Sequence, residues 1–145
     1  MGSSEETRIL IVDDDTGIRR LLRLLFMRQG WTVVAHADGE RVVDEIATLN
    51  PDVVVLDLML PKVSGFEVLK RLQAENPVCM KRIIVLTAVS TSSLGALTCE
   101  PDLWAVVRKP FDNTELVATV AECLQAHQSD DRNVGVRRQR LETTP

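Results

Sequence analysis

A short apolar strand that ends in a carboxylate constrains the fold of this chain more than any other feature. Residues 53–56 read VVVL, so every position is apolar and three of them are β-branched. Such a run is typical of a strand in a parallel sheet that helices cover on both faces. Asp57 follows at once, and a buried ionised carboxylate is costly unless another group compensates its charge. We therefore expect Asp57 to lie where its strand leaves the sheet, or beside a cation.

Apolar strands alternate with helical patterns along the rest of the chain. The first helix has the clearest pattern, because Ile18, Leu21, Leu22 and Leu25 recur at i, i+3, i+4 and i+7 before Gly30. Five strands alternating with five helices predict an α/β domain with a doubly wound parallel sheet, helices on both faces and right-handed crossovers. We expect strands at residues 8–13, 31–35, 53–57, 82–86 and 104–107, and helices through 18–25, 38–49, 66–72, 91–100 and 112–124.

The chain divides into an N-terminal extension at residues 1–7, one α/β domain at 8–125 and a polar segment at 126–145. The last segment lacks the apolar positions that would let it pack, so we expect a flexible tail or a truncated linker. Three of its arginines, at positions 137, 138 and 140, could contact nucleic acid, but a solvated tail is the preferred interpretation.

Composition excludes several classes of protein. The 145 residues carry a net charge of −4, which does not favour binding to nucleic acid or to an anionic membrane. No apolar run reaches the length of a membrane span, and the N-terminus lacks the features of a secretory signal. The cysteines, at positions 79, 99 and 123, have no CxxC spacing and are expected to be reduced thiols. His36 and His127 have no partner at zinc-ligand spacing.

Polar side chains end four of the five predicted strands. Asp13 and Asp14 follow the first strand, Asp57 the third, Thr87 the fourth and Lys109 the fifth. Each of them alone has an ordinary interpretation, as a helix cap or as a surface charge. The carboxyl ends of parallel strands meet at one edge of the sheet, where ligands bind in doubly wound folds. The coincidence of all these groups therefore predicts a functional site at that edge.

The groups expected at this edge suit a metal ion and a phosphoryl group. Two carboxylates roughly 4 Å apart repel by about 4 kcal/mol at an effective dielectric constant of about 20. A hard divalent cation relieves this repulsion, and oxygen ligands without histidine or cysteine favour Mg²⁺. Lys109 offers a positive charge and Thr87 a hydroxyl, and both groups suit phosphate oxygens. We therefore expect a phosphoryl group on or beside Asp57, where the carboxylate would act as a nucleophile.

Four motifs give this chain a family resemblance. They read IVDDD at residues 11–15, LDLMLP at 56–61 with Gly65 after it, LTA at 86–88 and KPF at 109–111. As a set they resemble the receiver domains of two-component response regulators, and the resemblance covers residues 6–125. It implies a flavodoxin-like (βα)5 fold of the CheY-like superfamily, whose parallel sheet has the strand order 2-1-3-4-5.

The resemblance also implies roles for individual residues. Asp57 would be the phosphoacceptor, which takes the phosphoryl group from the phosphohistidine of a histidine kinase in a reaction that needs Mg²⁺. Asp14 would bind Mg²⁺ directly, Asp13 largely through water, and the Met59 backbone carbonyl would complete the protein ligands together with Asp57. Thr87 and Lys109 would contact the phosphoryl group, and the bond before Pro110 would be cis.

The expected partners and setting follow from the same resemblance. They are a sensor histidine kinase or phosphotransfer protein, and a downstream effector protein or a fused output domain. The conformational change would be transmitted to partners through residues 88–125. The resemblance also allows a homodimer that forms through the fourth helix, the fifth strand and the fifth helix. The domain would be a cytoplasmic phosphoacceptor that assists its own phosphorylation and dephosphorylation, and would not be an enzyme in the ordinary sense.

Three positions depart from the family pattern. The family's switch usually pairs the threonine with an aromatic ring at the position of Val106, and this chain has no tyrosine. Trp104 lies on the same predicted strand face two residues earlier and could substitute, although burial in the core is the preferred interpretation. Met59 and Val89 stand at the positions that tune attack by water, and both are apolar. Slow autodephosphorylation is therefore our hypothesis.

Functions other than that of a separate response regulator are also compatible with parts of this sequence. The chain could be the receiver segment of a hybrid histidine kinase or of a multidomain regulator, or a pseudo-receiver that only binds partners. A haloacid-dehalogenase-type phosphatase also uses an aspartate at a strand end with Mg²⁺. Such an enzyme needs Asp-x-Asp-x-Thr after the first strand, and here Gly17 stands at the threonine position.

Overall fold

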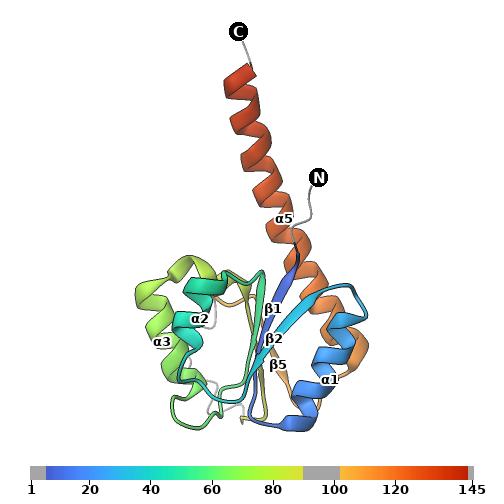
Figure 1. Cartoon of the computed structure of the whole chain (residues 1–145), viewed down its shortest axis with the longest axis vertical. Helices are drawn as coiled ribbons and strands as arrows, with labels where there is room; N and C mark the ends of the chain where they lie inside the picture. The colour runs from blue at the N-terminus through green and yellow to red at the C-terminus, as the bar shows by residue number, and fades with distance from the viewer. Residues whose placement is uncertain (1–5, 90–101, 144–145) are drawn as a thin grey trace.

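The fold is a single parallel sheet between two layers of helices (Figure 1). The structure is a computed structural model and describes residues 6–89 and 102–143, with side chains up to residue 128. The strands have the spatial order β2-β1-β3-β4-β5, and every neighbouring pair is parallel. This order confirms the doubly wound fold that the sequence predicts. The strands are β1 (Arg8–Val12), β2 (Thr32–His36), β3 (Val53–Leu56), β4 (Ile83–Thr87) and β5 (Ala105–Arg108).

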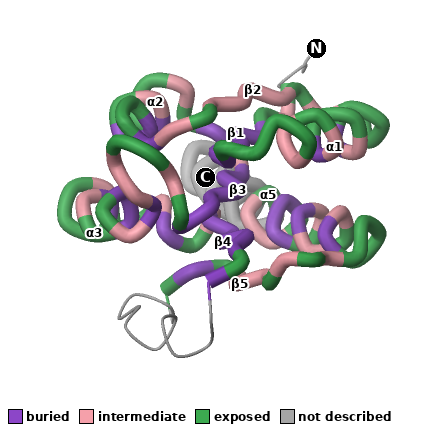
Figure 2. The backbone as a smooth tube through the Cα atoms, turned by 90° about the horizontal axis from the view of Figure 1, so that it is seen from below, coloured by how far each residue is buried: buried purple, intermediate pink, exposed green. Residues whose placement is uncertain are grey.

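Two apolar cores lie on the two faces of the sheet. Because side chains alternate along a strand, Leu10 and Val12 face one layer of helices while Ile9 and Ile11 face the other. The helices α2 (Val42–Leu49) and α3 (Gly65–Glu75) cover the first face. The helices α1 (Thr16–Met27) and α5 (Asn113–Thr143) cover the second face, and Figure 2 shows the buried strands between the two layers. The central strand β3 is buried at every position, as its VVVL sequence predicts.

Short polar side chains fix where the helices begin. The carboxylate of Asp15 accepts a hydrogen bond from the amide of Ile18 at 3.1 Å and caps α1. Asp112 accepts one from the amide of Glu115 at 2.9 Å and caps α5 in the same way. Such caps satisfy amides that have no partner inside the helix. They also start both helices at the edge of the sheet where the predicted site lies.

Several boundaries differ from the prediction. The helix expected to open at Asp38 begins instead at Val42, because the Asp38 carboxylate accepts a hydrogen bond from the amide of Glu40 and forms a turn. A 3-10 helix, η1 (Pro77–Arg82), precedes β4 and was not predicted. The helix predicted at 91–100 lies outside the described residues, as does Cys99, whereas Cys79 and Cys123 are free thiols.

The last helix is longer than the sequence suggested. Instead of the expected irregular tail at 126–145, α5 continues as a helix to Thr143 and extends away from the sheet (Figure 1). A helix that is already anchored can lengthen without the cost of a new nucleus, so polar residues can continue it. The assignment of residues 126–145 as a linker stays a prediction. Among the described residues, no helix combines the length and the apolar character that crossing a membrane requires.

Candidate functional site

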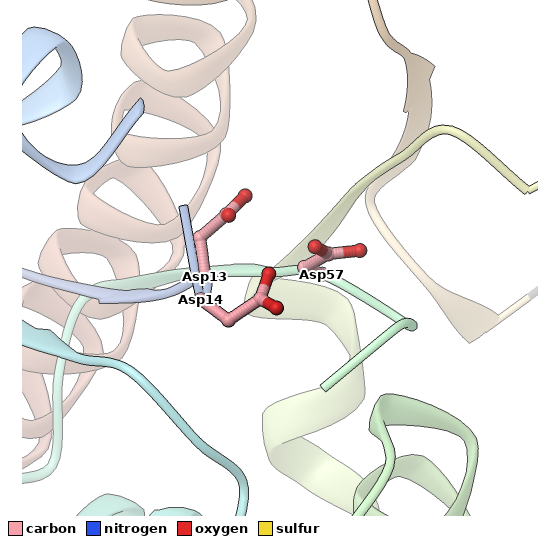
Figure 3. Close-up of side chains that lie close together, drawn as sticks. All are labelled: Asp13, Asp14 and Asp57. Atoms are coloured by element: carbon pink, nitrogen blue, oxygen red, sulfur yellow. The ribbon is translucent and has the colours of Figure 1, made fainter. Parts of the chain in front are cut away.

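Three carboxylates meet at the carboxyl edge of the sheet. Asp13 follows β1 and Asp57 follows β3, and these strands are neighbours. Backbone hydrogen bonds from the amide of Asp13 to the carbonyl of His36 and from the amide of Asp57 to the carbonyl of Val12 continue the sheet ladder through both residues. Asp13 is 2 % exposed and Asp57 3 %, whereas Asp14 is exposed. Carboxylate oxygens of the three residues lie within 4.8 Å of one another, and Figure 3 shows them grouped.

Lys109 joins the two buried carboxylates. Its Nζ lies 2.8 Å from Oδ2 of Asp13 and 3.1 Å from Oδ2 of Asp57. The other oxygen of each carboxylate accepts a hydrogen bond from a backbone amide, that of Asp15 at 2.9 Å and that of Met59 at 3.0 Å. Each carboxylate is therefore held at both oxygens, and one ammonium compensates two negative charges.

Burial and ion pairing both shift the pKa values of Asp13 and Lys109. Burial raises the pKa of Asp13, and hydrogen bonds from Lys109 and from the amide of Asp15 offset only part of that rise. Burial alone would lower the pKa of Lys109, but its hydrogen bonds to Asp13 and Asp57 reverse this and leave the pKa raised. Lys109 is therefore held in its charged form by the carboxylates that it joins.

Thr87 and Lys109 reach the site from adjacent strands. Thr87 ends β4 and is fully buried, and its Oγ1 accepts a hydrogen bond from the amide of Val89 at 3.1 Å. The amide of Lys109 donates to the carbonyl of Thr87 at 2.9 Å, which places the two residues side by side. The bond between Lys109 and Pro110 is cis, as the resemblance implied. The structure thus brings all four predicted strand ends to one edge.

The loop after Asp57 is held closely beneath the site. The amide of Gly65 donates to the carbonyl of Leu58 at 2.9 Å. A Cβ atom at Gly65 would overlap the carbonyl of Asp57 and the Cα of Leu58, so only glycine fits there. The side chain of Met59 is 61 % exposed, and the metal-binding role of its carbonyl stays a prediction.

The carboxylate cluster can hold a metal ion. Its donors are oxygens only, from Asp13, Asp14 and Asp57, and the single ammonium of Lys109 leaves an excess of negative charge. Hard divalent cations prefer such a donor set, and Mg²⁺ in particular needs few protein ligands because it retains several waters. The residues present therefore fit the predicted metal.

The predicted switch positions differ in their surroundings. Val106 lies opposite Val85 of β4 and packs, partly buried, against the core on the α2 and α3 side. Trp104 precedes β5 and is 36 % exposed, so the preferred interpretation that it is buried in the core is wrong. Its ring lies beside that of His127 on α5, with 5.8 Å between centroids and an angle of 60° between the ring planes. The sequence could not show this contact, because it depends on how α5 crosses the end of β5.

Sequence reasoning missed two residues near the site. Lys62 has a positive φ of 67°, and its side chain reaches Asp38 and Glu40 in the loop before α2. Gly39, in that same loop, lies against the carbonyl of Val63. No local motif marks these contacts, although a glycine shortly before an apolar helix pattern is a weak signal of close backbone approach.

The fold and the site together define a doubly wound α/β domain with a cluster of carboxylates and a lysine at the switch point of its sheet. The family model of the response regulator receiver domain matches residues 9–121. This chain therefore belongs to the response regulator receiver domain family and is a component of two-component signal transduction.

Curated relatives are regulators about twice as long as this chain. It is 36 % identical over 121 residues to the probable transcriptional regulator ycf27 of Porphyridium aerugineum, covering 83 % of this chain and 49 % of that protein. The DNA-binding response regulator MtrA of Mycolicibacterium smegmatis is 34 % identical, with 85 % and 53 % covered. PhoP of Bacillus subtilis, the alkaline phosphatase synthesis transcriptional regulatory protein, is 36 % identical, with 81 % and 48 % covered. The chain spans about half the length of these relatives.

Solved structures agree with the family assignment. A CheY-like receiver domain protein of Methanospirillum hungatei superposes with a TM-score of 0.77 at 25 % identity, covering 87 % of this chain and 99 % of that one. A response regulator described as putative, from Chloroflexus aurantiacus, superposes with a TM-score of 0.72 at 30 % identity, covering 83 % and 99 %. Both match nearly their whole length, so the similarity extends over a complete domain.

Proposed function

We propose that this receiver domain accepts a phosphoryl group on Asp57 from the phosphohistidine of a histidine kinase or a phosphotransfer protein. One observation carries the proposal: Asp57 is a buried carboxylate whose two oxygens are held by the Met59 amide and the Lys109 ammonium. A buried, oriented carboxylate beside a fixed cation is suited to act as a nucleophile toward a charged phosphoryl group.

The reaction follows from this arrangement. An oxygen of Asp57 forms a bond to phosphorus while the bond from phosphorus to the histidine nitrogen of the donor breaks. The leaving imidazole keeps the electron pair of that bond and takes up a proton. The Met59 amide holds one oxygen of Asp57, so that attack comes from a fixed direction.

The remaining groups stabilise the charge that the transfer brings into the site. Mg²⁺, held by Asp13, Asp14 and Asp57, would supply positive charge for the phosphoryl oxygens. Lys109 Nζ lies close enough to both buried carboxylates to shift from Asp57 to a phosphoryl oxygen. Thr87 ends the strand β4 beside Lys109, and its hydroxyl would contact the phosphoryl group.

A protein that donates the phosphoryl group must dock beside Asp57, and α1 offers a suitable surface. Arg20, Arg23, Leu24 and Met27 are exposed at i, i+3, i+4 and i+7 and so share one helix face. Leu24 is 51 % and Met27 56 % exposed, and α1 contains no acidic residue. We infer that the donor presents a surface that is acidic and partly apolar.

The setting of the domain is proposed from the same comparisons. Because the relatives are described as transcriptional regulators and a DNA-binding response regulator, we infer a cytoplasmic regulator whose output is an effector protein or a fused DNA-binding domain. These relatives favour a regulator over the receiver of a hybrid kinase. The domain would be a phosphoacceptor and not a turnover enzyme. The homodimer through the predicted fourth helix, β5 and α5 stays a prediction.

Phosphoryl incorporation tests the proposal. The full chain is treated with phosphoramidate, a small donor that also carries a bond from phosphorus to nitrogen, and the intact protein mass is followed. One phosphoryl group is expected in the presence of Mg²⁺, and none is expected in Asp57→Asn or with EDTA. Asp44→Asn removes an exposed carboxylate on α2 and is the matched control that keeps full labelling. Labelling that persists in Asp57→Asn would refute the assignment, and so would hydrolysis of p-nitrophenyl phosphate with turnover, which the phosphatase alternative requires.

A further inference from the structure

Arg19 reaches from the start of α1 back to the strand end that carries the first two carboxylates. Its Nη1 donates a hydrogen bond to the backbone carbonyl of Asp13 at 2.8 Å. Its Nη2 donates to Oγ1 of Thr16 at 3.2 Å. Hydrogen bonds from an ionised donor are shorter and stronger than those between neutral groups, and a planar guanidinium that makes two of them has a fixed direction. Arg19 is therefore attached in a defined orientation to the loop between β1 and α1.

The carbonyl that Arg19 holds belongs to the peptide unit that joins Asp13 to Asp14. A peptide unit is planar, so a carbonyl held in place also holds the amide of Asp14. The amide of Asp13 donates to the carbonyl of His36 at 3.1 Å. The amide of Asp15 donates to Oδ1 of Asp13 at 2.9 Å. The backbone is thus fixed before and after Asp14, and Arg19 supplies the contact at the peptide unit itself.

Asp14 depends on this backbone more than the two buried carboxylates do. Asp13 and Asp57 are each held at both oxygens. Asp14 is exposed, and no hydrogen bond or ion pair from the described residues holds its carboxylate. An oxygen of Asp14 nevertheless lies within 4.8 Å of oxygens of the other two, as Figure 3 shows. Within the described part of the chain, the backbone is therefore what keeps the third carboxylate in the cluster.

The stability of α1 does not explain an arginine at this position. The N-terminal end of a helix carries a partial positive charge, so a cation close to it is unfavourable. The helix begins at Thr16, and Arg19 is its fourth residue. Arg20 and Arg23 on the same helix are exposed, whereas Arg19 is partly buried. The contact with the loop is what compensates for the unfavourable position of this cation.

We propose that Arg19 is a positioning residue of the metal site, which sets the affinity of the carboxylate cluster for Mg²⁺ by holding the peptide unit between Asp13 and Asp14. This inference rests on the proposed binding of Mg²⁺ at the cluster. Replacing a group that orients metal ligands without touching the metal typically weakens metal binding by about 10- to 100-fold. The charge of Arg19 acts in the opposite sense, because a cation near the cluster repels Mg²⁺. Positioning and charge therefore predict opposite changes when the guanidinium is removed.

Amide NMR spectra of the full chain, recorded as MgCl₂ is added, test the proposal. The shifts of the Asp14 and Met59 amides give the Kd for Mg²⁺. Arg19→Met should raise this Kd about tenfold, although it removes a repelling charge. Arg19→Lys keeps the charge, but its side chain is one bond shorter and has a single nitrogen, so it should raise the Kd as well. Arg28→Met removes an exposed guanidinium just after α1 and is the matched control, with an unchanged Kd.

Spectra of the same variants in EDTA distinguish positioning from a general structural role. In both Arg19 variants the Asp14 amide resonance should move, because the carbonyl of its peptide unit has lost a hydrogen bond. The amide resonances of Thr87 and Val89, on the far side of the site, should stay in place. Resonances that change throughout the sheet would show a general structural role and would overturn the proposal.

The remaining outcomes separate the role of Arg19 from the proposed function. The absence of any Mg²⁺-dependent shift in the unmodified chain overturns the metal site itself. Binding in the unmodified chain that stays equal or becomes tighter in Arg19→Met overturns the positioning role alone. If Arg19→Met does not give the spectrum of a folded protein, an unchanged Kd in Arg19→Lys overturns that role in the same way.

Discussion

Lys109→Met tests the electrostatic account of the site most directly. The substitution keeps an apolar side chain of similar length and removes the ammonium that lies 2.8 Å from Asp13 and 3.1 Å from Asp57. Removing one partner of a buried ion pair costs about 3–5 kcal/mol. The two carboxylates that remain lie within 4.8 Å of each other, and their repulsion at an effective dielectric constant of about 20 is about 3.5 kcal/mol or more. We therefore expect the free energy of unfolding to fall by about 3–5 kcal/mol in EDTA.

The pH dependence of this loss has a definite sign. Burial already raises the pKa of Asp13, and Lys109 is the first of the groups that lower it. Without the lysine the pKa of Asp13 rises further, so the folded variant binds protons more strongly than the unfolded chain. Stability then falls as pH increases. The loss relative to the unmodified protein should be larger near about pH 8 than near about pH 5.

Urea unfolding in EDTA and in Mg²⁺ measures both effects. Mg²⁺ should restore part of the stability of Lys109→Met, because a bound cation replaces the missing positive charge. Lys70→Met is the matched control on the exposed side of α3, and its stability should stay within about 0.5 kcal/mol of the unmodified protein. A loss below about 1 kcal/mol for Lys109→Met in EDTA at about pH 8 would refute the conclusion that the lysine compensates both carboxylates.

Three further predictions concern the loop and the cysteines. Gly65→Ala should lower the free energy of unfolding by about 1–3 kcal/mol, because its Cβ would overlap backbone atoms. A urea midpoint equal to that of the unmodified protein would contradict this. Met59→Asn should shorten the phosphoryl lifetime severalfold by orienting a water, and a lifetime unchanged in mass spectra would contradict slow autodephosphorylation. Burial raises the pKa of Cys123 to about 12 and that of Cys79 to about 11. Both should resist iodoacetamide near neutral pH until the protein unfolds, and rapid labelling in peptide maps of the native protein would contradict this.

The sheet and the placement of the site could be predicted because both follow from local pattern. When strands of β-branched residues alternate with amphipathic helices, few sheet topologies are possible. Parallel strands then bring their carboxyl ends to the same edge of the sheet. This argument placed Asp13, Asp57, Thr87 and Lys109 together without any knowledge of the distances.

What escaped prediction depends on contacts between segments that are distant in sequence. Lys109 was expected to contact phosphate, whereas in the structure it pairs with two carboxylates. This pairing depends on the order of the strands, in which only β4 lies between β3 and β5. The exposure of Trp104 depends on where α5 crosses the strand ends. The positive φ of Lys62 leaves no trace in composition or periodicity. The length of α5 was missed because hydrophobic pattern predicts packing, whereas an anchored helix can continue without it.

The contact between Trp104 and His127 gives the protein its own optical reporter. The chain has two tryptophans and no tyrosine, so its near-ultraviolet emission comes from indole alone. The other tryptophan, Trp31, lies beside Phe26, with 5.7 Å between the ring centroids. Replacing Trp31 with phenylalanine would leave one emitter at the point where α5 leaves the sheet. Fluorescence could then follow that junction in solution, without an attached dye, while the carboxylate site is loaded.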